Sequence, residues 1–268
     1  MGKVWAAYFS ATGTTEKVVK AIAEEISRIS RMEMAVFDFT LPDARTEPKT
    51  FNKDDIVIFG TPVYAGRVPN VLIKYIMSIS GGGAKAVPVV LYGNRNYDDA
   101  LIELRNALVE DGFRPMAAAA FIGEHSFSRG LAAGRPDEDD MKTVRGFAAK
   151  AAEKLNGEYI LPVEVRGESP FRPYYQPRDR QGNPVNILKV KPKTDVRCTK
   201  CGLCAAVCPM GSIDPENVSE VRGICIKCGA CVKKCPVGAK YYDDAGYLYH
   251  KTELELGYER RAEPELFY

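Results

Sequence analysis

All eight cysteines of this chain fall between residues 198 and 236, and their spacing constrains the fold more than any other feature. They form two copies of C-x2-C-x2-C-x3-C-P. In this spacing three thiolates line a tight loop around one cubane, and the fourth leaves that loop to ligate the other cluster. The sequence therefore predicts two [4Fe-4S] clusters. The predicted ligands are Cys198, Cys201, Cys204 and Cys235 for the first cluster, and Cys225, Cys228, Cys231 and Cys208 for the second.

Disulfides and zinc are the two other uses of so many cysteines. The chain starts Met-Gly-Lys-Val-Trp without an apolar h-region or cleavage site, so we expect a reducing, cytoplasmic location. Four-cysteine zinc sites bring cysteines in pairs with a longer spacer, not in triplets followed by Cys-Pro. Over residues 190–245 the chain instead resembles the bacterial two-cluster ferredoxins.

Length and charge limit what the rest of the chain can be. A ferredoxin of this type needs only about 55 residues, so roughly two hundred remain for one further domain. No apolar stretch approaches the roughly 18 residues of a membrane span. The formal charge of +2 counts cysteines as neutral, whereas two clusters with their thiolates remove about 4 units. We therefore expect no membrane and no nucleic acid. We expect a basic stretch near the first cluster to compensate the charge of that cluster, with a nucleic-acid patch as the weaker alternative. The stretch consists of Lys189, Lys191, Lys193, Arg197 and Lys200.

The N-terminus is typical of an anion site. Residues 3–9 read as a buried strand, the loop Ser10-Ala11-Thr12-Gly13-Thr14-Thr15 follows, and a helix with apolar periodicity comes next. Free N–H groups and the helix dipole point at such a loop. It lacks both G-x-x-x-x-G-K-[ST] and G-x-G-x-x-G, so a single terminal phosphate suits it best. The alternative is that Thr12 and Thr14 only cap the helix.

The first 155 residues continue as an alternation of strands and helices. Further strands are predicted over 33–38, 55–60, 86–92 and 115–122, and helices over 69–80, 98–111 and 137–156. This pattern predicts a doubly wound α/β fold whose five parallel strands have the order 2-1-3-4-5. Its ligand would bind beyond the carboxyl ends of the strands, between the first and third.

The loops at those carboxyl ends carry a resemblance to a known family. Gly60 to Pro69 follows the third strand and Tyr92 to Asp99 follows the fourth. With the hydroxyl-rich loop, they resemble the phosphate loop and the two isoalloxazine loops of flavodoxins. The whole chain is similar to flavodoxin/ferredoxin fusion proteins, with a flavodoxin-like domain followed by a small α+β two-cluster ferredoxin domain.

This resemblance implies FMN and a set of residues that would bind it. Tyr64 and Tyr97 would stack on the ring, with ordinary packing as the alternative. Arg67 and Arg95 replace the acidic surroundings usual in flavodoxins, so we expect a raised flavin potential. Asp98 and Asp99 would cancel part of that charge, or serve as first-turn helix carboxylates. The implied FMN-binding residues are Ser10, Thr12, Gly13, Thr14, Thr15, Pro62, Tyr64, Gly66, Arg67, Gly93, Asn94, Arg95, Tyr97 and Asp98.

His125 is the one candidate for a catalytic side chain. It lies in the loop that follows the fifth predicted strand, where a ligand could be reached. A proton donor near the flavin and a loop histidine bonded to backbone are both consistent with that place. No catalytic role is assigned.

Four segments are predicted: a flavodoxin-like domain over 1–157, a proline-rich strap over 158–192, a ferredoxin domain over 193–245 and a tail over 246–268. The strap could be a rigid spacer or a free tether. We expect the aromatic terminus to be docked. Because we expect two separate cores, each half should fold alone when the chain is cut near Pro184.

The predicted function is electron transfer. A flavin accepts one or two electrons and each cluster only one, so the chain would relay electrons between redox partner proteins. The alternatives are a flavin-dependent reductase whose substrate binds near His125, and a redox-sensing module. Direct oxidation of NADH or NADPH is disfavoured, because no G-x-G-x-x-G follows the first domain.

Overall fold

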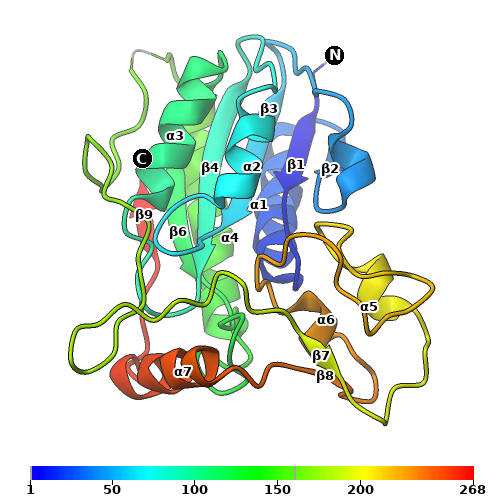
Figure 1. Cartoon of the computed structure of the whole chain (residues 1–268). Coiled ribbons are helices and arrows are strands. Elements are labelled where there is room, and N and C mark those ends of the chain that lie inside the picture. The colour runs from blue at the N-terminus through cyan, green and yellow to red at the C-terminus, as the bar shows by residue number, and fades with distance from the viewer. Residues whose placement is uncertain (1, 160) are drawn as a thin grey trace.

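The computed structural model describes residues 2–159 and 161–268. Its centre is a parallel sheet in the order β2-β1-β3-β4-β6, which confirms the predicted flavodoxin-like fold (Figure 1). The predicted strand over 115–122 is divided in two, and both pieces pair with β4. The strands are β1 (Val4–Tyr8), β2 (Met34–Asp38), β3 (Ile56–Pro62), β4 (Lys85–Tyr92), β5 (Arg114–Pro115) and β6 (Ala118–Ile122).

Helices cover both faces of this sheet, which is why its central strands are continuous apolar runs. The helices α1 (Thr14–Ser30) and α4 (Glu138–Leu155) share one core with one face. The helices α2 (Asn70–Ile76) and α3 (Ala100–Glu110) pack on the other. A short 3-10 helix, η1 (Pro42–Arg45), follows β2. No helix among the described residues has the length and apolar character of a membrane span.

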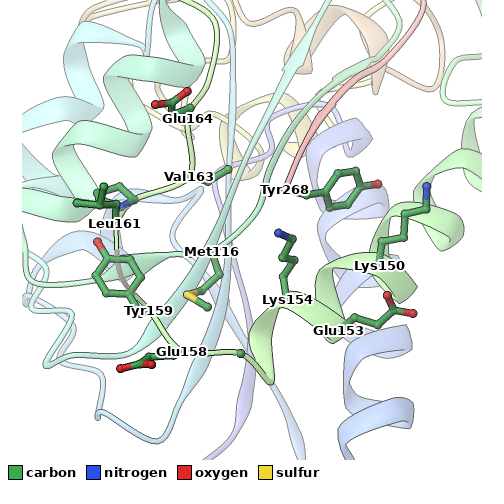
Figure 2. Close-up of a pocket in the computed structure, with 12 residues that line it drawn as sticks. Met116, Lys150, Glu153, Lys154, Glu158, Tyr159, Leu161, Val163, Glu164 and Tyr268 are labelled. Carbon is green, nitrogen blue, oxygen red and sulfur yellow. The ribbon is translucent and has the colours of Figure 1, made fainter.

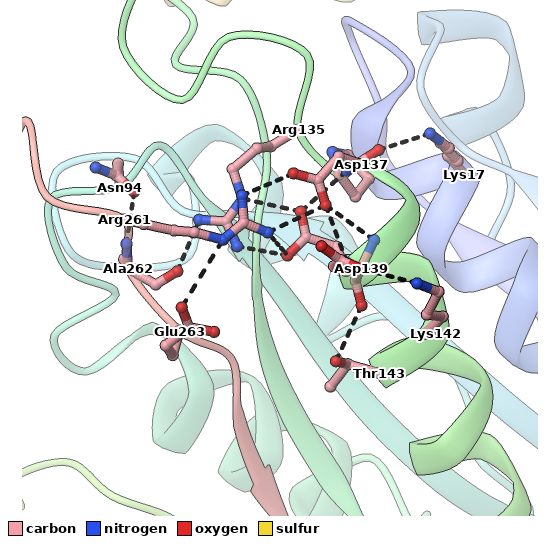
Figure 3. A network of polar contacts seen from close by, with 12 residues as sticks. Lys17, Asn94, Arg135, Asp137, Asp139, Lys142, Thr143, Arg261, Ala262 and Glu263 are labelled. Atoms are coloured by element: carbon pink, nitrogen blue, oxygen red, sulfur yellow. Dashed lines mark hydrogen bonds and ion pairs between the residues drawn. The ribbon is translucent and has the colours of Figure 1, made fainter.

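The C-terminus returns to the sheet of the first domain. The strand β9 (Glu265–Phe267) pairs antiparallel with β6 and forms the edge of the sheet. A polar network holds the chain just before it (Figure 3). Arg135 Nη1 donates to the Ala262 carbonyl (2.7 Å), and Asn94 Nδ2 donates to the Arg260 carbonyl (2.7 Å). The terminus is therefore docked, as expected, and its partner is the flavodoxin-like domain.

The proline-rich strap lies against the same domain. The Tyr175 N–H donates to the Ala65 carbonyl (2.8 Å), and the Tyr174 hydroxyl donates to the Val68 carbonyl (2.9 Å). The buried carboxylate of Asp99 accepts the backbone N–H of Arg172 at 2.7 Å. Of the two forms that the sequence allowed, the structure has the fixed spacer.

The cysteine-rich segment is small and lies beside the carboxyl ends of the parallel strands (Figure 1). Cys228 and Ala230 belong to the same core as β3 and α3. The cysteine segment has a small core of its own around Ile213, Val218 and Cys231, and it also contributes Cys228 and Ala230 to the core of the first domain. The elements of this segment and of the tail are β7 (Lys193–Thr194), α5 (Leu203–Ala206), α6 (Ala230–Lys233), β8 (Lys240–Tyr241) and α7 (Ala245–Gly257).

Candidate functional site

The eight cysteines line two separate hollows. In the described part of the chain, no three His, Cys, Asp or Glu side chains are placed to hold a single metal ion. Cys198, Cys201, Cys204 and Cys235 line the first, and Cys208, Cys225, Cys228 and Cys231 line the second. Each hollow thus combines three cysteines of one motif with the fourth of the other, in the sets predicted from the spacing.

The two hollows differ in exposure. Cys201 is exposed, whereas Cys228 and Cys231 are buried. Burial raises the pKa of the Cys228 thiol to about 12, so without metal this sulfur keeps its proton and cluster assembly must release it. Backbone N–H groups donate to sulfur at both hollows, from Ala239 to Cys235 (3.2 Å) and from Ser212 to Cys208 (3.3 Å). Thiols in crossed sets with N–H donors fit iron–sulfur clusters.

A third cavity lies at the carboxyl ends of the strands. Of the predicted FMN-binding residues and His125, the structure brings eight to its wall. They are Ser10, Thr12, Thr14, Thr15, Pro62, Tyr64, Gly93 and His125.

The hydroxyl loop forms one end of this cavity. Gly13 is the N-cap of α1 with φ 97°, a left-handed conformation that favours glycine. Gly13 has no side chain with which to cap the helix, and the side-chain bond that the described chain has at this helix end comes from Ser10, not from Thr12 or Thr14. Ser10 Oγ accepts the Glu16 N–H at 3.0 Å. The free hydroxyls at the helix N-terminus fit a phosphate.

At the other end of this cavity, His125 is held in one tautomer. Its Nδ1 accepts the Phe127 N–H at 3.1 Å, so the neutral ring carries its proton on Nε2. Burial, with Lys233 nearby, lowers the pKa of His125 to about 4, so it is uncharged at neutral pH. A Cβ on Gly93 would lie 2.4 Å from Cδ2 of this ring. Glycine at position 93 is therefore required by the histidine.

The two arginines assigned to the flavin loops serve the strap instead. Arg67 forms a two-pronged ion pair with Glu103 (2.8 and 2.6 Å), and its guanidinium lies 4.6 Å from the ring of Phe171. Arg95 pairs with Asp98 and lies over Tyr175, 4.4 Å from the ring centre. Neither arginine lines the cavity. The expected rise in flavin potential therefore loses its basis.

Other predicted flavin contacts also lie outside the cavity. Tyr97 is buried in the core, and its hydroxyl donates to Glu265 Oε2 at 2.6 Å. The Asn94 amide holds the tail. Gly66 packs so closely on Asp98 that a Cβ there would lie 2.2 Å from Oδ2. Tyr97 and Asn94 bond to the tail, whereas Gly66 and Asp98 pack the two loops against each other.

The second cysteine hollow and the third cavity share a wall. Cys228 lines both. Lys233 Nζ crosses between the two parts, pairing with Glu124 (2.5 Å) and donating to the His125 carbonyl (2.7 Å). A Cβ on Gly229 would lie 2.5 Å from the Ser126 carbonyl oxygen. No sequence pattern indicates this contact, because its partners are about one hundred residues apart.

A further hollow among the described residues lies away from these sites. It is an open groove near the C-terminal end of α4 and the start of β6, shown in Figure 2. Met116, Lys154 and Tyr268 line it. It contains none of the predicted site residues, and it lies at the opposite end of β6 from His125.

Comparisons with known proteins agree with both parts. Residues 6–86 match the flavodoxin domain family, and residues 197–240 match the 4Fe-4S dicluster domain family. No curated protein matches the chain. The chain thus combines the two domains as a flavodoxin/ferredoxin fusion does, which indicates FMN and iron–sulfur clusters as cofactors and electron transfer as the general activity.

Three solved structures are similar to part of the chain. Oxidised flavodoxin 1 from Bacillus cereus is 23% identical, covers 57% of this chain and 98% of its own, and has a TM-score of 0.44. Oxidised flavodoxin 2 from Bacillus cereus is 18% identical over 57% and 99% of the two chains, with a TM-score of 0.43. A flavodoxin from the domain Archaea is 16% identical over 59% and 100%, with a TM-score of 0.39.

Proposed function

We propose that this flavodoxin/ferredoxin fusion relays electrons between two [4Fe-4S] clusters and FMN within one chain. The observation that carries the proposal is the position of Cys228, which lines both the second cysteine hollow and the cavity at the carboxyl ends of the strands, where we place FMN. A cluster ligand in the wall of the flavin cavity supports transfer between adjacent centres.

The difference in burial supports an order for the relay. The first cysteine set includes the exposed Cys201, with Leu203 and Val237 exposed beside it. The second set has Cys228 and Cys231 buried against the first domain. A protein partner can therefore approach the first cluster, and the second cluster passes electrons between it and the flavin.

The residues of the cavity have distinct parts in this function. The loop from Ser10 to Thr15 would bind the phosphate, Tyr64 would pack on the ring, and the uncharged His125 would offer its Nε2–H. FMN supplies a centre that accepts one or two electrons, whereas each cluster carries one. The chain would thereby couple one-electron partners to two-electron partners.

The same geometry favours the relay over a reductase. Cys228 lines the cavity together with Tyr64 and His125, and the Lys233 ion pair holds the cysteine segment there. A substrate placed over the ring would have to displace that segment. A relay needs no such movement.

The test is anaerobic photoreduction of the intact, loaded chain over a range of protein concentrations, followed by visible and EPR spectroscopy. Iron, sulfide and FMN contents should first give two clusters and one flavin per chain. Transfer between clusters and flavin should be first order and independent of concentration, because both centres belong to one molecule. A rate that rises with protein concentration would show that the centres communicate only between molecules, and would overturn the proposal.

A further inference from the structure

One tyrosine makes a direct contact with a predicted cluster ligand. The Tyr242 hydroxyl oxygen lies 3.6 Å from Cys225 Sγ, and Tyr242 lines the second cysteine hollow. We infer that this hydroxyl donates a hydrogen bond to the sulfur and makes the second cluster easier to reduce. The inference rests on the proposed function only in taking Cys225 as a cluster ligand.

The direction of the hydrogen bond follows from the chemistry of the ligand. Between a thiol and a phenol either atom could donate. A cysteine that binds iron is a thiolate and has no proton to give. The phenol must then be the donor, and a hydrogen bond to an ionised acceptor is stronger than a neutral one.

This bond distinguishes the second cluster from the first. At the first hollow the donors to sulfur are backbone N–H groups, from Lys200 to Cys198 (3.4 Å) and from Ala239 to Cys235 (3.2 Å). Within the described residues, Tyr242 is the one side chain with a hydroxyl bonded to a cysteine sulfur. Hydrogen bonds to the sulfurs help to set the potential of an iron–sulfur cluster. They favour the reduced form, which carries one more negative charge, so Tyr242 would draw the electron towards the cluster beside the flavin cavity.

The tyrosine is held in place from the flavodoxin-like domain. Its ring stacks on Tyr247, with centroids 4.3 Å apart and planes at 28°. Tyr247 packs on Phe127 at 4.7 Å, and Phe127 donates its N–H to His125 in the wall of the flavin cavity. The position of the Tyr242 hydroxyl therefore depends on contacts between the two parts of the chain.

The test compares Tyr242→Phe with Tyr247→Phe in the intact, loaded chain. Both changes remove one hydroxyl and keep a stacked ring, and in the described chain the Tyr247 hydroxyl has no hydrogen bond to a cysteine. EPR-monitored redox titration should show the second cluster of Tyr242→Phe shifted threefold to tenfold towards the oxidised form. For a one-electron couple this is about 30 to 59 mV downward. The first cluster, and both clusters of Tyr247→Phe, should keep their potentials.

A second substitution gives the opposite sign and remains informative if the phenylalanine variant assembles poorly. Replacement of Tyr242 by 3,5-difluorotyrosine makes the hydroxyl a stronger donor and should raise the potential of the second cluster. Unchanged potentials in both proteins, with iron and sulfide contents intact, would overturn the inference and leave the relay standing. An absence of clusters from the unaltered chain would instead refute the proposed function itself.

Discussion

The anchoring of the strap leads to a prediction about Asp99. This carboxylate is fully buried and accepts the backbone N–H groups of Glu168 (3.0 Å) and Arg172 (2.7 Å), as well as Arg172 Nε (3.0 Å). Asp99→Asn keeps the shape but removes the charge. Its amide nitrogen would face donors where a carboxylate oxygen now accepts, so the strap should come loose from the domain.

The size of the effect follows from the pKa of Asp99. Hydrogen bonds from the Arg172 side chain lower this pKa from 3.8 to about 2, a change that corresponds to about 2.5 kcal/mol. Because Arg172 is 43% exposed, solvent screens part of the pairing, and we expect Asp99→Asn to lose about 2 kcal/mol. A depressed carboxyl pKa contributes stability above the unfolded value. The difference between the two proteins should therefore be complete above pH 4 and shrink as pH falls towards 2.

Denaturant unfolding measures this loss, and trypsin measures the release of the strap. Glu168→Gln is the matched control, because Glu168 faces the same arginine at 3.6 Å but is 62% exposed. It should change the free energy of unfolding by less than about 0.5 kcal/mol. In Asp99→Asn, cleavage should become faster at Arg166, Arg178 and Arg180. Equal stability and equal cleavage in both variants would mean that the strap is not held by Asp99.

Three further substitutions test the cofactor sites and their contact. Thr12→Val with Thr14→Val should release FMN while both clusters remain, since each lost bond to the phosphate is worth roughly 1.5 to 3 kcal/mol; unchanged flavin affinity would refute the phosphate site. Cys235→Ala should damage the cluster of the first motif, and EPR showing loss only of the second cluster would refute the crossed pairing. Lys233→Met leaves Glu124 without its partner and should cost about 2 kcal/mol in unfolding, whereas the exposed Lys142→Met should change it by less than about 0.5 kcal/mol; equal losses would contradict a special role for the contact.

Local chemistry was predictable from the sequence. The cysteine spacing predicts two crossed sets of four thiols, and the same two sets line the two hollows. The loop from Ser10 to Thr15 was predictable for the same reason, because a strand, a hydroxyl-rich turn and a helix follow one another directly. In both places the residues that act together lie within one short segment of the chain.

Distant partners were not predictable. Arg67 lies in a loop that suits a flavin, but its guanidinium pairs with Glu103 and packs on the ring of Phe171 in the strap. Tyr97 has an aromatic ring in the expected loop, yet the acceptor of its hydroxyl is Glu265, 168 residues later. A short strand such as β9 carries too little periodicity to be recognised alone. The errors fall where the tail and the strap return to cover the first domain.

The return of the tail leads to a last prediction, which reverses our expectation that the chain can be cut near Pro184. A fragment of residues 1–185 loses β9 and leaves Tyr97 and Arg135 without the acceptors at Glu265 and Ala262. It also exposes the edge of β6, which favours aggregation.

Val185 and Gly246 lie together, since a Cβ on Gly246 would be 3.0 Å from Val185 Cγ1. A short Gly/Ser linker in place of residues 186–245 should therefore restore the tail without the cluster-binding segment. We expect this spliced chain to be more stable than the fragment by about 3 to 5 kcal/mol, from several recovered hydrogen bonds of about 1 kcal/mol each and the repaired edge. Denaturant unfolding of the two proteins decides the matter, because equal stability would mean that the tail only rests on the sheet. Neither protein should bind FMN as tightly as the full chain, since both lack Cys228 in the cavity wall.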